Sequence, residues 1–233
     1  MKKLTVNFTK TEVILGWIYM VLQLLVLPVA LQLGNELAGY PLSEAKLNFC
    51  YFALNFLCVT IIFRKYLLGN LKCFFLHAGR SITAAVLGLI GYWGLSFAVS
   101  MVIVAVYPEF NNVNDANVSL LVQENFALTA FGTVLLVPIT EELLFRGLIF
   151  RGIYNRSRFW AYAISAIAFS LPHVVGYIGQ YEPLHLLMCF VQYLPAGLCL
   201  GWAYARADSI FAPVLMHTVI NLLGVFAMRL LYA

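Results

Sequence analysis

Charged residues are scarce in this chain of 233 residues: they make up 10% of the sequence, whereas 63% of it is hydrophobic. A soluble globular domain has about 25% charged residues, so this chain lacks the polar surface that would keep it in water. The low charge therefore excludes a soluble enzyme, a disordered scaffold and a free nucleic-acid-binding domain. It predicts an all-α polytopic membrane helix bundle, with about seven transmembrane helices and one interfacial helix.

Other features are missing as well. The sequence has no internal repeat, no low-complexity tract and no glycine-rich phosphate loop. Its five cysteines are odd in number and lack metal-type spacing, so they predict neither a disulfide framework nor a cysteine metal site. A single membrane domain over residues 1–233 is enough to account for the chain, with the lipid bilayer and no nucleic acid among its expected partners.

Long apolar stretches are present instead. A helix needs about 20 apolar residues to cross the hydrocarbon core, and seven stretches qualify. They lie near residues 13–33, 46–63, 81–107, 126–150, 159–179, 184–205 and 210–228. We interpret the first as a retained span, because it lacks a convincing small-residue cleavage site. The basic stretch 65–80 is too short to cross and predicts the interfacial helix.

The basic residues predict the orientation. With the amino terminus inside, nearly all of them outside the spans are cytoplasmic, and only Lys46 and Arg229 are external. The cytoplasmic set is Lys2, Lys3, Lys10, Arg64, Lys65, Lys72, Arg80, Arg151, Arg156, Arg158 and Arg206. We therefore expect a cytoplasmic N-terminus and an external C-terminus. The short loops and lysine-rich start favour a bacterial plasma membrane first and an endoplasmic reticulum membrane second. The polar stretch 108–125 is then a long external loop, with a glycosylation sequon at Asn117 that matters only in a secretory-pathway host.

Three ionisable residues lie inside the fourth span: Glu141, Glu142 and Arg146. A charge at membrane depth is costly, so such residues face the bundle interior and pair. Glu142 and Arg146 are four residues apart and therefore neighbours on one helix face, whereas Glu141 is rotated about 100° away. The spacing predicts a Glu142–Arg146 pair and leaves Glu141 free for chemistry; an ion-paired patch without chemistry is the alternative.

Two further predicted spans carry polar residues at depth. Pro172 is expected to kink the fifth span beside His173, and His217 and Asn221 share one face of the seventh. Structural hydrogen bonding between helices explains any one of these groups, but three helices together indicate a catalytic or transport site. We expect His77 and His185 at the water boundary, and Gln192 and Tyr193 either to line a cavity or to pack as ordinary helix residues.

The segments EELLFR from Glu141, FSLPH from Phe169 and HTVIN from His217 resemble the EExxxR, FxxxH and HxxxN/D motifs of the CPBP family. This family contains the CAAX-protease and bacteriocin-processing (Abi) intramembrane peptidases, with the type II CAAX prenyl endopeptidases among them. All three motifs occur in order, and the resemblance covers about 126–228. It implies catalytic roles for Glu141, Glu142, His173, His217 and Asn221, with Arg146 and Phe169 in support.

The resemblance implies hydrolysis of a peptide bond by an activated water, in a peptide precursor or a prenylated or membrane-anchored protein. Glu141 is the expected general base and His173 helps to orient the water. His217 and Asn221 donate hydrogen bonds to the oxyanion. The sequence ends without a cysteine near Ala233, so we do not expect it to be a CAAX substrate itself.

The proposed hydrolysis does not require a metal ion at these residues. The family is often labelled a metallopeptidase, and zinc, if bound, is expected on Glu141, His173 and His217. A mechanism that uses only glutamate and histidine fits them equally well. Two other classes stay open: a proton-coupled transporter, which the missing repeat disfavours, and a non-enzymatic bacteriocin immunity or binding protein.

Overall fold

The computed structural model describes residues 4–231 and confirms the all-α class. Lys2, Lys3 and Ala233, which bear on the orientation and on the chain end, lie outside the described residues. Within the described range the backbone forms helices and turns, and its only β feature is an isolated bridge between Ile178 and Tyr181. The helices are α1 (Lys10–Val21), η1 (Leu22–Val26), α2 (Leu27–Leu37), α3 (Glu44–Ile62), α4 (Arg64–Leu76), α5 (Ala78–Val106), α6 (Val113–Glu124), α7 (Phe126–Phe131), η2 (Gly132–Leu136), α8 (Val137–Glu142), η3 (Leu143–Phe150), α9 (Arg151–Tyr154), α10 (Arg158–Ser170), α11 (Pro172–Val175), α12 (Pro183–Ala207) and α13 (Phe211–Leu231).

Six continuous helices in the described chain are long and apolar enough to cross a membrane. They are Lys10–Leu37, Glu44–Ile62, Ala78–Val106, Phe126–Tyr154, Pro183–Ala207 and Phe211–Leu231. The expected seventh crossing near 159–179 is not one helix, because it is divided into α10 and α11. Pro172 has no backbone N–H and its ring clashes with the carbonyl four residues earlier, so the helix ends just before it. Neither piece reaches the length of about 20 residues that a crossing needs.

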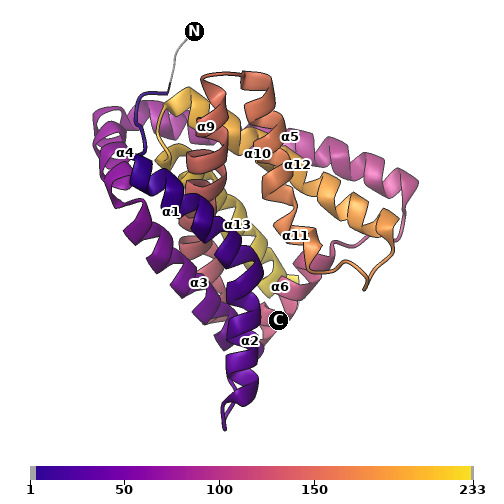
Figure 1. Ribbon diagram of the computed structural model, residues 1–233. Coiled ribbons are helices and arrows are strands. Elements are labelled where there is room, and N and C mark those ends of the chain that lie inside the picture. Colours follow the sequence, from indigo (N-terminus) through magenta and orange to yellow (C-terminus); the bar gives the residue numbers. More distant parts are fainter. Residues whose placement is uncertain (1–3, 232–233) are drawn as a thin grey trace.

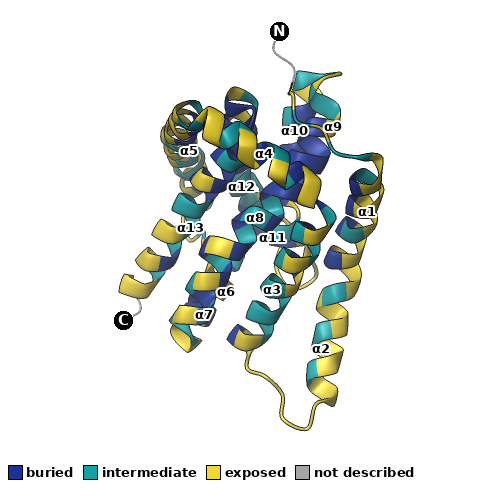
Figure 2. Ribbon diagram, turned by 90° about the vertical axis from the view of Figure 1, so that its left-hand side faces the viewer, coloured by how far each residue is buried: buried dark blue, intermediate teal, exposed yellow. Residues whose placement is uncertain are grey.

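The fourth span, Phe126–Tyr154, lies at the centre of the bundle (Figure 1). Of its most apolar 18-residue window, 56% is buried inside the protein, against 6% for α5. Figure 2 shows the contrast, because α2 and α5 are largely exposed while the helices around α8 and α10 carry the buried residues. The outer helices therefore offer apolar surface to lipid, and the central span is surrounded by protein.

Two stretches of wider π-helical turns precede prolines in the spans. η1 ends two residues before Pro28, and η2 ends two residues before Pro138. Proline removes one backbone donor, and local π adjustment re-satisfies the freed groups inside a membrane helix. The helix thus continues through Pro138 and delivers Glu141 and Glu142 at the end of α8.

The polarity of the stretch 108–125 had suggested a long loop. Most of this stretch is instead a helix, α6. Asn112 accepts hydrogen bonds from the backbone N–H groups of Asn114 and Asp115 and so caps α6. Val113 and Val122 are buried on the inner face of this helix. An N-cap side chain satisfies the free N–H groups of the first turn, which lets a short polar helix form against the bundle.

The stretch predicted to be an interfacial helix is a helix, α4, and it is fastened to the bundle. Its Tyr66 stacks on Phe8 at 3.8 Å, and the Tyr66 and Tyr204 hydroxyls are 2.7 Å apart. Asn70 accepts a hydrogen bond from the backbone N–H of Ile210. These buried contacts join α4 to the turn between α12 and α13, whereas its position at a membrane surface stays a prediction.

Candidate active site

The EELLFR segment spans the junction of α8 and η3, and its arginine is fully buried with Glu142. Arg146 Nη1 donates to Glu142 Oε1 at 3.0 Å, as the four-residue spacing predicts, and Nη2 donates to the carbonyl of Gly197 at 3.1 Å. The guanidinium also lies 4.3 Å from the centroid of the Phe169 ring, a cation–π contact. The positive charge of Arg146 is therefore committed to Glu142, and Phe169 supports the pair.

Gly197 allows α12 to approach α10 closely enough for this contact. A Cβ at Gly197 would lie 2.7 Å from the Cα of Ala166, closer than any side chain could fit. Because glycine has no Cβ, the two backbones pack directly, and the Gly197 carbonyl comes within reach of Arg146.

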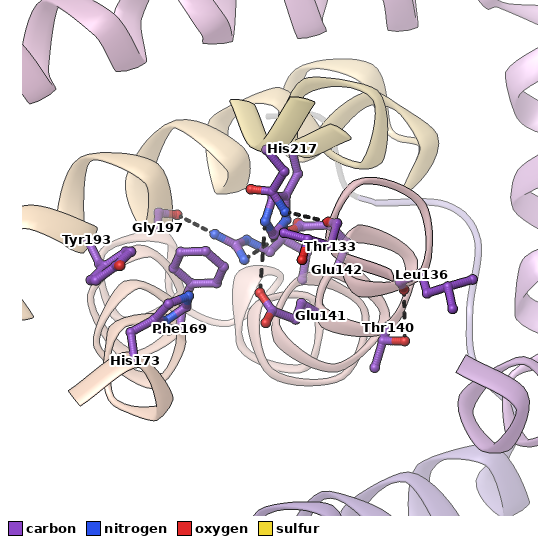
Figure 3. A network of polar contacts seen from close by, with 12 residues as sticks. Thr133, Leu136, Thr140, Glu141, Glu142, Phe169, His173, Tyr193, Gly197 and His217 are labelled. Carbon is purple, nitrogen blue, oxygen red and sulfur yellow. Dashed lines mark hydrogen bonds and ion pairs between the residues drawn. The ribbon is translucent and has the colours of Figure 1, made fainter. Parts of the chain in front are cut away.

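Glu141 is the less enclosed of the two glutamates. Its side chain is 23% exposed, against 0% for Glu142, and it faces a cavity of about 510 Å³. Its Oε2 has no hydrogen-bond partner within the described chain and lies 3.9 Å from His217 Nε2 (Figure 3). Of the two carboxylates, Glu141 is thus the one that can accept a proton from a molecule in the cavity.

His217 of α13 lies between the two glutamates. Its Nδ1 is 3.0 Å from Glu142 Oε1, and since an ionised carboxylate only accepts, Nδ1 carries the proton. Asn221, one turn further along α13, donates through Nδ2 to the carbonyl of Thr133 at 2.8 Å. Glu142 therefore holds both Arg146 and His217, and η2 holds Asn221.

His173 lies in α11, immediately after the proline break. Its Nδ1 is 2.9 Å from the Phe169 carbonyl, so Nδ1 donates and Nε2 of the neutral ring is left as an acceptor. The Tyr193 ring stacks on the imidazole, with 4.1 Å between centroids and 26° between planes. His173 thus lies four residues after Phe169 and contacts it by one hydrogen bond, with Pro172 at the start of α11 between them.

Glu141, His173, His217 and Asn221 line the same cavity, so the structure brings the predicted site residues of three motifs together. Gln192 and Tyr193 of α12 line it too, which settles the open choice between cavity and ordinary packing. The complete lining of the cavity comes from eight helices. They are η2, α8, α11, α12 and α13, together with α3, α5 and α6, which contribute polar residues.

The contribution of α6 was not foreseen. Asn112, Asn114 and Asp115 line the cavity and meet the hydroxyl of Tyr193. Burial raises the pKa of Asp115 above its ordinary value, and the hydrogen bond from Tyr193 opposes that shift. A polar Asn-rich sequence is typical of loops as well as caps, so composition alone did not indicate a cavity wall.

The other two histidines lie outside the cavity. His77 is exposed, as expected, but His185 is only 9% exposed, so its expected surface placement is wrong, while its depth relative to the water boundary stays a prediction. Its ring contacts those of Tyr107 and Phe110, and its Nε2 is 2.8 Å from the Asn111 carbonyl. Nearby aromatic rings and one backbone acceptor are enough to bury an imidazole there.

The residues proposed as zinc ligands do not form a ligand cluster in this arrangement. Within residues 4–231, no three His, Cys, Asp or Glu side chains lie close enough together to hold a metal ion. Glu141, His173 and His217 line one cavity, and each histidine has Nδ1 held by a protein oxygen and Nε2 left as the ligand atom, but the three side chains are not close enough together to share an ion. We therefore derive no step through a metal.

Fold and site together define a class: an integral membrane protein of helices around a buried Glu–Arg–His site. Residues 123–223 match a family described as "Type II CAAX prenyl endopeptidase Rce1-like". The chain is 32% identical over 97 residues to "UPF0177 protein YxdF" of Lactococcus lactis and 32% identical over 85 residues to "Putative membrane peptidase YdiL" of Bacillus subtilis. The CPBP-type resemblance is thereby confirmed over the region that carries the three motifs.

These matches are partial. They cover 42% and 36% of this chain, and 48% and 30% of the two relatives. The chain thus spans about half the length of one relative and about a third of the other. No solved structure matches it.

Proposed function

We propose that this chain is an intramembrane endopeptidase in which Glu141 activates a water molecule. The observation that carries the proposal is the different environment of the two adjacent glutamates. Glu142 is fully buried and its Oε1 is held by Arg146 and His217, whereas the Glu141 side chain is 23% exposed and lines the cavity. The Rce1-like match and the relative named as a membrane peptidase support the same reaction class.

The chemistry follows from these positions. Glu141 takes a proton from water as the water oxygen attacks the peptide carbonyl, and His173 accepts a hydrogen bond from the same water at Nε2. General-base assistance of this kind contributes about 10²–10⁴-fold in rate. Glu141 then gives the proton to the leaving amine as the C–N bond breaks, which returns the site to its starting state.

The oxyanion of the tetrahedral intermediate needs donors. Asn221 uses one amide N–H on Thr133 and keeps a second N–H for the oxyanion. His217 has Nδ1 held by Glu142 and Nε2 on the side of Glu141, and it donates from Nε2 in its doubly protonated form. Each such donor is worth about 10²–10³-fold in rate.

The substrate class is a peptide segment that reaches the cavity from the membrane or its surface. A second hollow of about 460 Å³ between α2, α3 and α6 shares lining residues with the active-site cavity, among them Asn48, Tyr51 and Asn117. An extended peptide could lie along both. Peptide precursors, prenylated proteins and other membrane-anchored proteins all fit, in processing, CAAX-type maturation or bacteriocin self-immunity.

A cleavage assay on the purified protein tests the proposal. A library of fluorogenic peptides, with and without lipid anchors, is incubated with wild type, Glu141→Ala and the control Glu36→Gln, which changes an exposed carboxylate on α2. Cleavage by wild type and the control, but not by Glu141→Ala, is expected. Parallel samples with a chelator report metal dependence. Equal cleavage by Glu141→Ala would overturn the mechanism, and no cleavage by wild type would favour a binding role.

A further inference from the structure

Tyr193 belongs to none of the three motifs, yet it touches one of their side chains. Its ring lies face to face with the His173 imidazole, at 4.1 Å and 26° (Figure 3). The imidazole also contacts Phe169, through the Phe169 carbonyl and the tilted Phe169 ring at 5.1 Å. The plane of His173 is therefore fixed between one hydrogen bond and one stacked ring.

The hydroxyl of Tyr193 is held in turn by the first turn of α6. Asn114 Nδ2 donates to it at 3.0 Å, and the hydroxyl lies 2.9 Å from Asp115 Oδ1 and 3.3 Å from Asn112 Oδ1. Asn112 also donates to Gln192 on α12 at 2.7 Å. Two neighbouring residues of α12 are thus fastened to α6, a segment about 80 residues earlier in the sequence.

We propose that Tyr193 is the positioning residue for His173, with Asn112, Asn114 and Asp115 of α6 as its anchor. This inference rests on the proposed function. Stacking keeps the imidazole plane in one orientation, so that Nε2 is presented to the cavity that Glu141 also lines. Without the stacked ring, only the hydrogen bond to Phe169 holds the imidazole. The ring then turns away from that carbonyl for part of the time, and the water is oriented for a smaller fraction of the time.

Two variants of Tyr193 and one matched control separate positioning from general packing. Tyr193→Leu removes the stacked ring, and Tyr193→Phe keeps the ring but loses the anchor to α6. The control is Tyr177→Phe, because Tyr177 also bonds to α6 through Asn117, at 3.1 Å, but does not line the cavity. All are made in the full chain and measured in the same detergent.

The kinetic readout is the division of the effect between kcat and KM. A misplacement of about 1 Å at a catalytic group costs about 10²-fold, so Tyr193→Leu is expected to lower kcat by about 10- to 10²-fold with KM little changed. Tyr193→Phe is expected to lie between wild type and Tyr193→Leu, and Tyr177→Phe to match wild type. Equal kcat in all four proteins would overturn the proposal.

A second readout does not depend on activity. In protein labelled with ¹⁵N-histidine, His173 of wild type is expected to show one tautomer, with the proton on Nδ1. In Tyr193→Leu, the two ring-nitrogen shifts move toward each other as both tautomers become populated. An unchanged His173 signal in Tyr193→Leu contradicts the proposal even if activity falls. If wild type cleaves nothing, the proposed function fails while this spectrum still decides the positioning role.

Discussion

Breaking the buried pair between Glu142 and Arg146 should destabilise the protein strongly. Both side chains are 0% exposed and their charged atoms are 3.0 Å apart. Arg146→Met keeps a long side chain but leaves Glu142 with His217 as its remaining partner. Removing one member of a buried pair costs about 3–5 kcal/mol, because the other charge is left without compensation. For a chain of this size that corresponds to a fall in Tm of roughly 6–20 °C.

A double-mutant cycle measures how far the two residues depend on each other. Thermal unfolding in detergent is followed for wild type, Arg146→Met, Glu142→Gln and the double variant. Since neither charge remains in the double variant, it should recover part of the lost stability, with a coupling of about 0.5–3 kcal/mol. Activity should stay low, because His217 no longer has its carboxylate. Arg156→Met, at an exposed turn residue, is the control and should unfold like wild type.

Additive effects of the two substitutions would refute this reasoning. They would mean that Glu142 and Arg146 do not interact energetically. The assignment of Glu141 as the free base depends on that pair and would fall with it.

Two further predictions concern packing and topology. Gly197→Ala places a methyl group 2.7 Å from the Ala166 Cα and should cost about 1–3 kcal/mol with reduced activity, whereas Gly94→Ala, whose Cβ meets nothing within 4 Å, should be neutral in thermal unfolding and turnover. If α10 and α11 together make the seventh crossing, a reporter fused after Ala233 should report the external face and one fused after Arg158 the cytoplasm; the same side for both is the result of six crossings and would show the predicted orientation to be wrong.

The sequence predicted those parts of the site that depend on local geometry. Glu142 and Arg146 pair because residues four apart share a helix face, and His217 and Asn221 are one turn apart on α13 for the same reason. That these groups meet His173 was expected from polar residues on three helices and from the family resemblance, but spacing within one helix could not show it. Contact between distant helices depends on packing, such as the close approach at Gly197.

The sequence did not reveal the parts of the structure where the polarity of a segment is a poor guide to its burial or to its length as a helix. The Asn-rich segment around Asn112 looked like an exterior loop, but its capped helix α6 forms a cavity wall. Pro172 was expected to kink a span and instead ends α10, so a crossing expected from composition became two short helices. His185 was expected at the water boundary, but aromatic rings enclose its side chain.

The substitution Glu141→Gln tests the central claim most directly. Glutamine has nearly the same shape as glutamate but cannot take a proton from water, so only the chemical step is removed. With a peptide that wild type cleaves, turnover by Glu141→Gln is expected to fall by about 10²–10⁴-fold, while expression, Tm and peptide binding stay near wild type. Turnover at the wild-type rate in well-folded Glu141→Gln would contradict the assignment of Glu141 as the catalytic base.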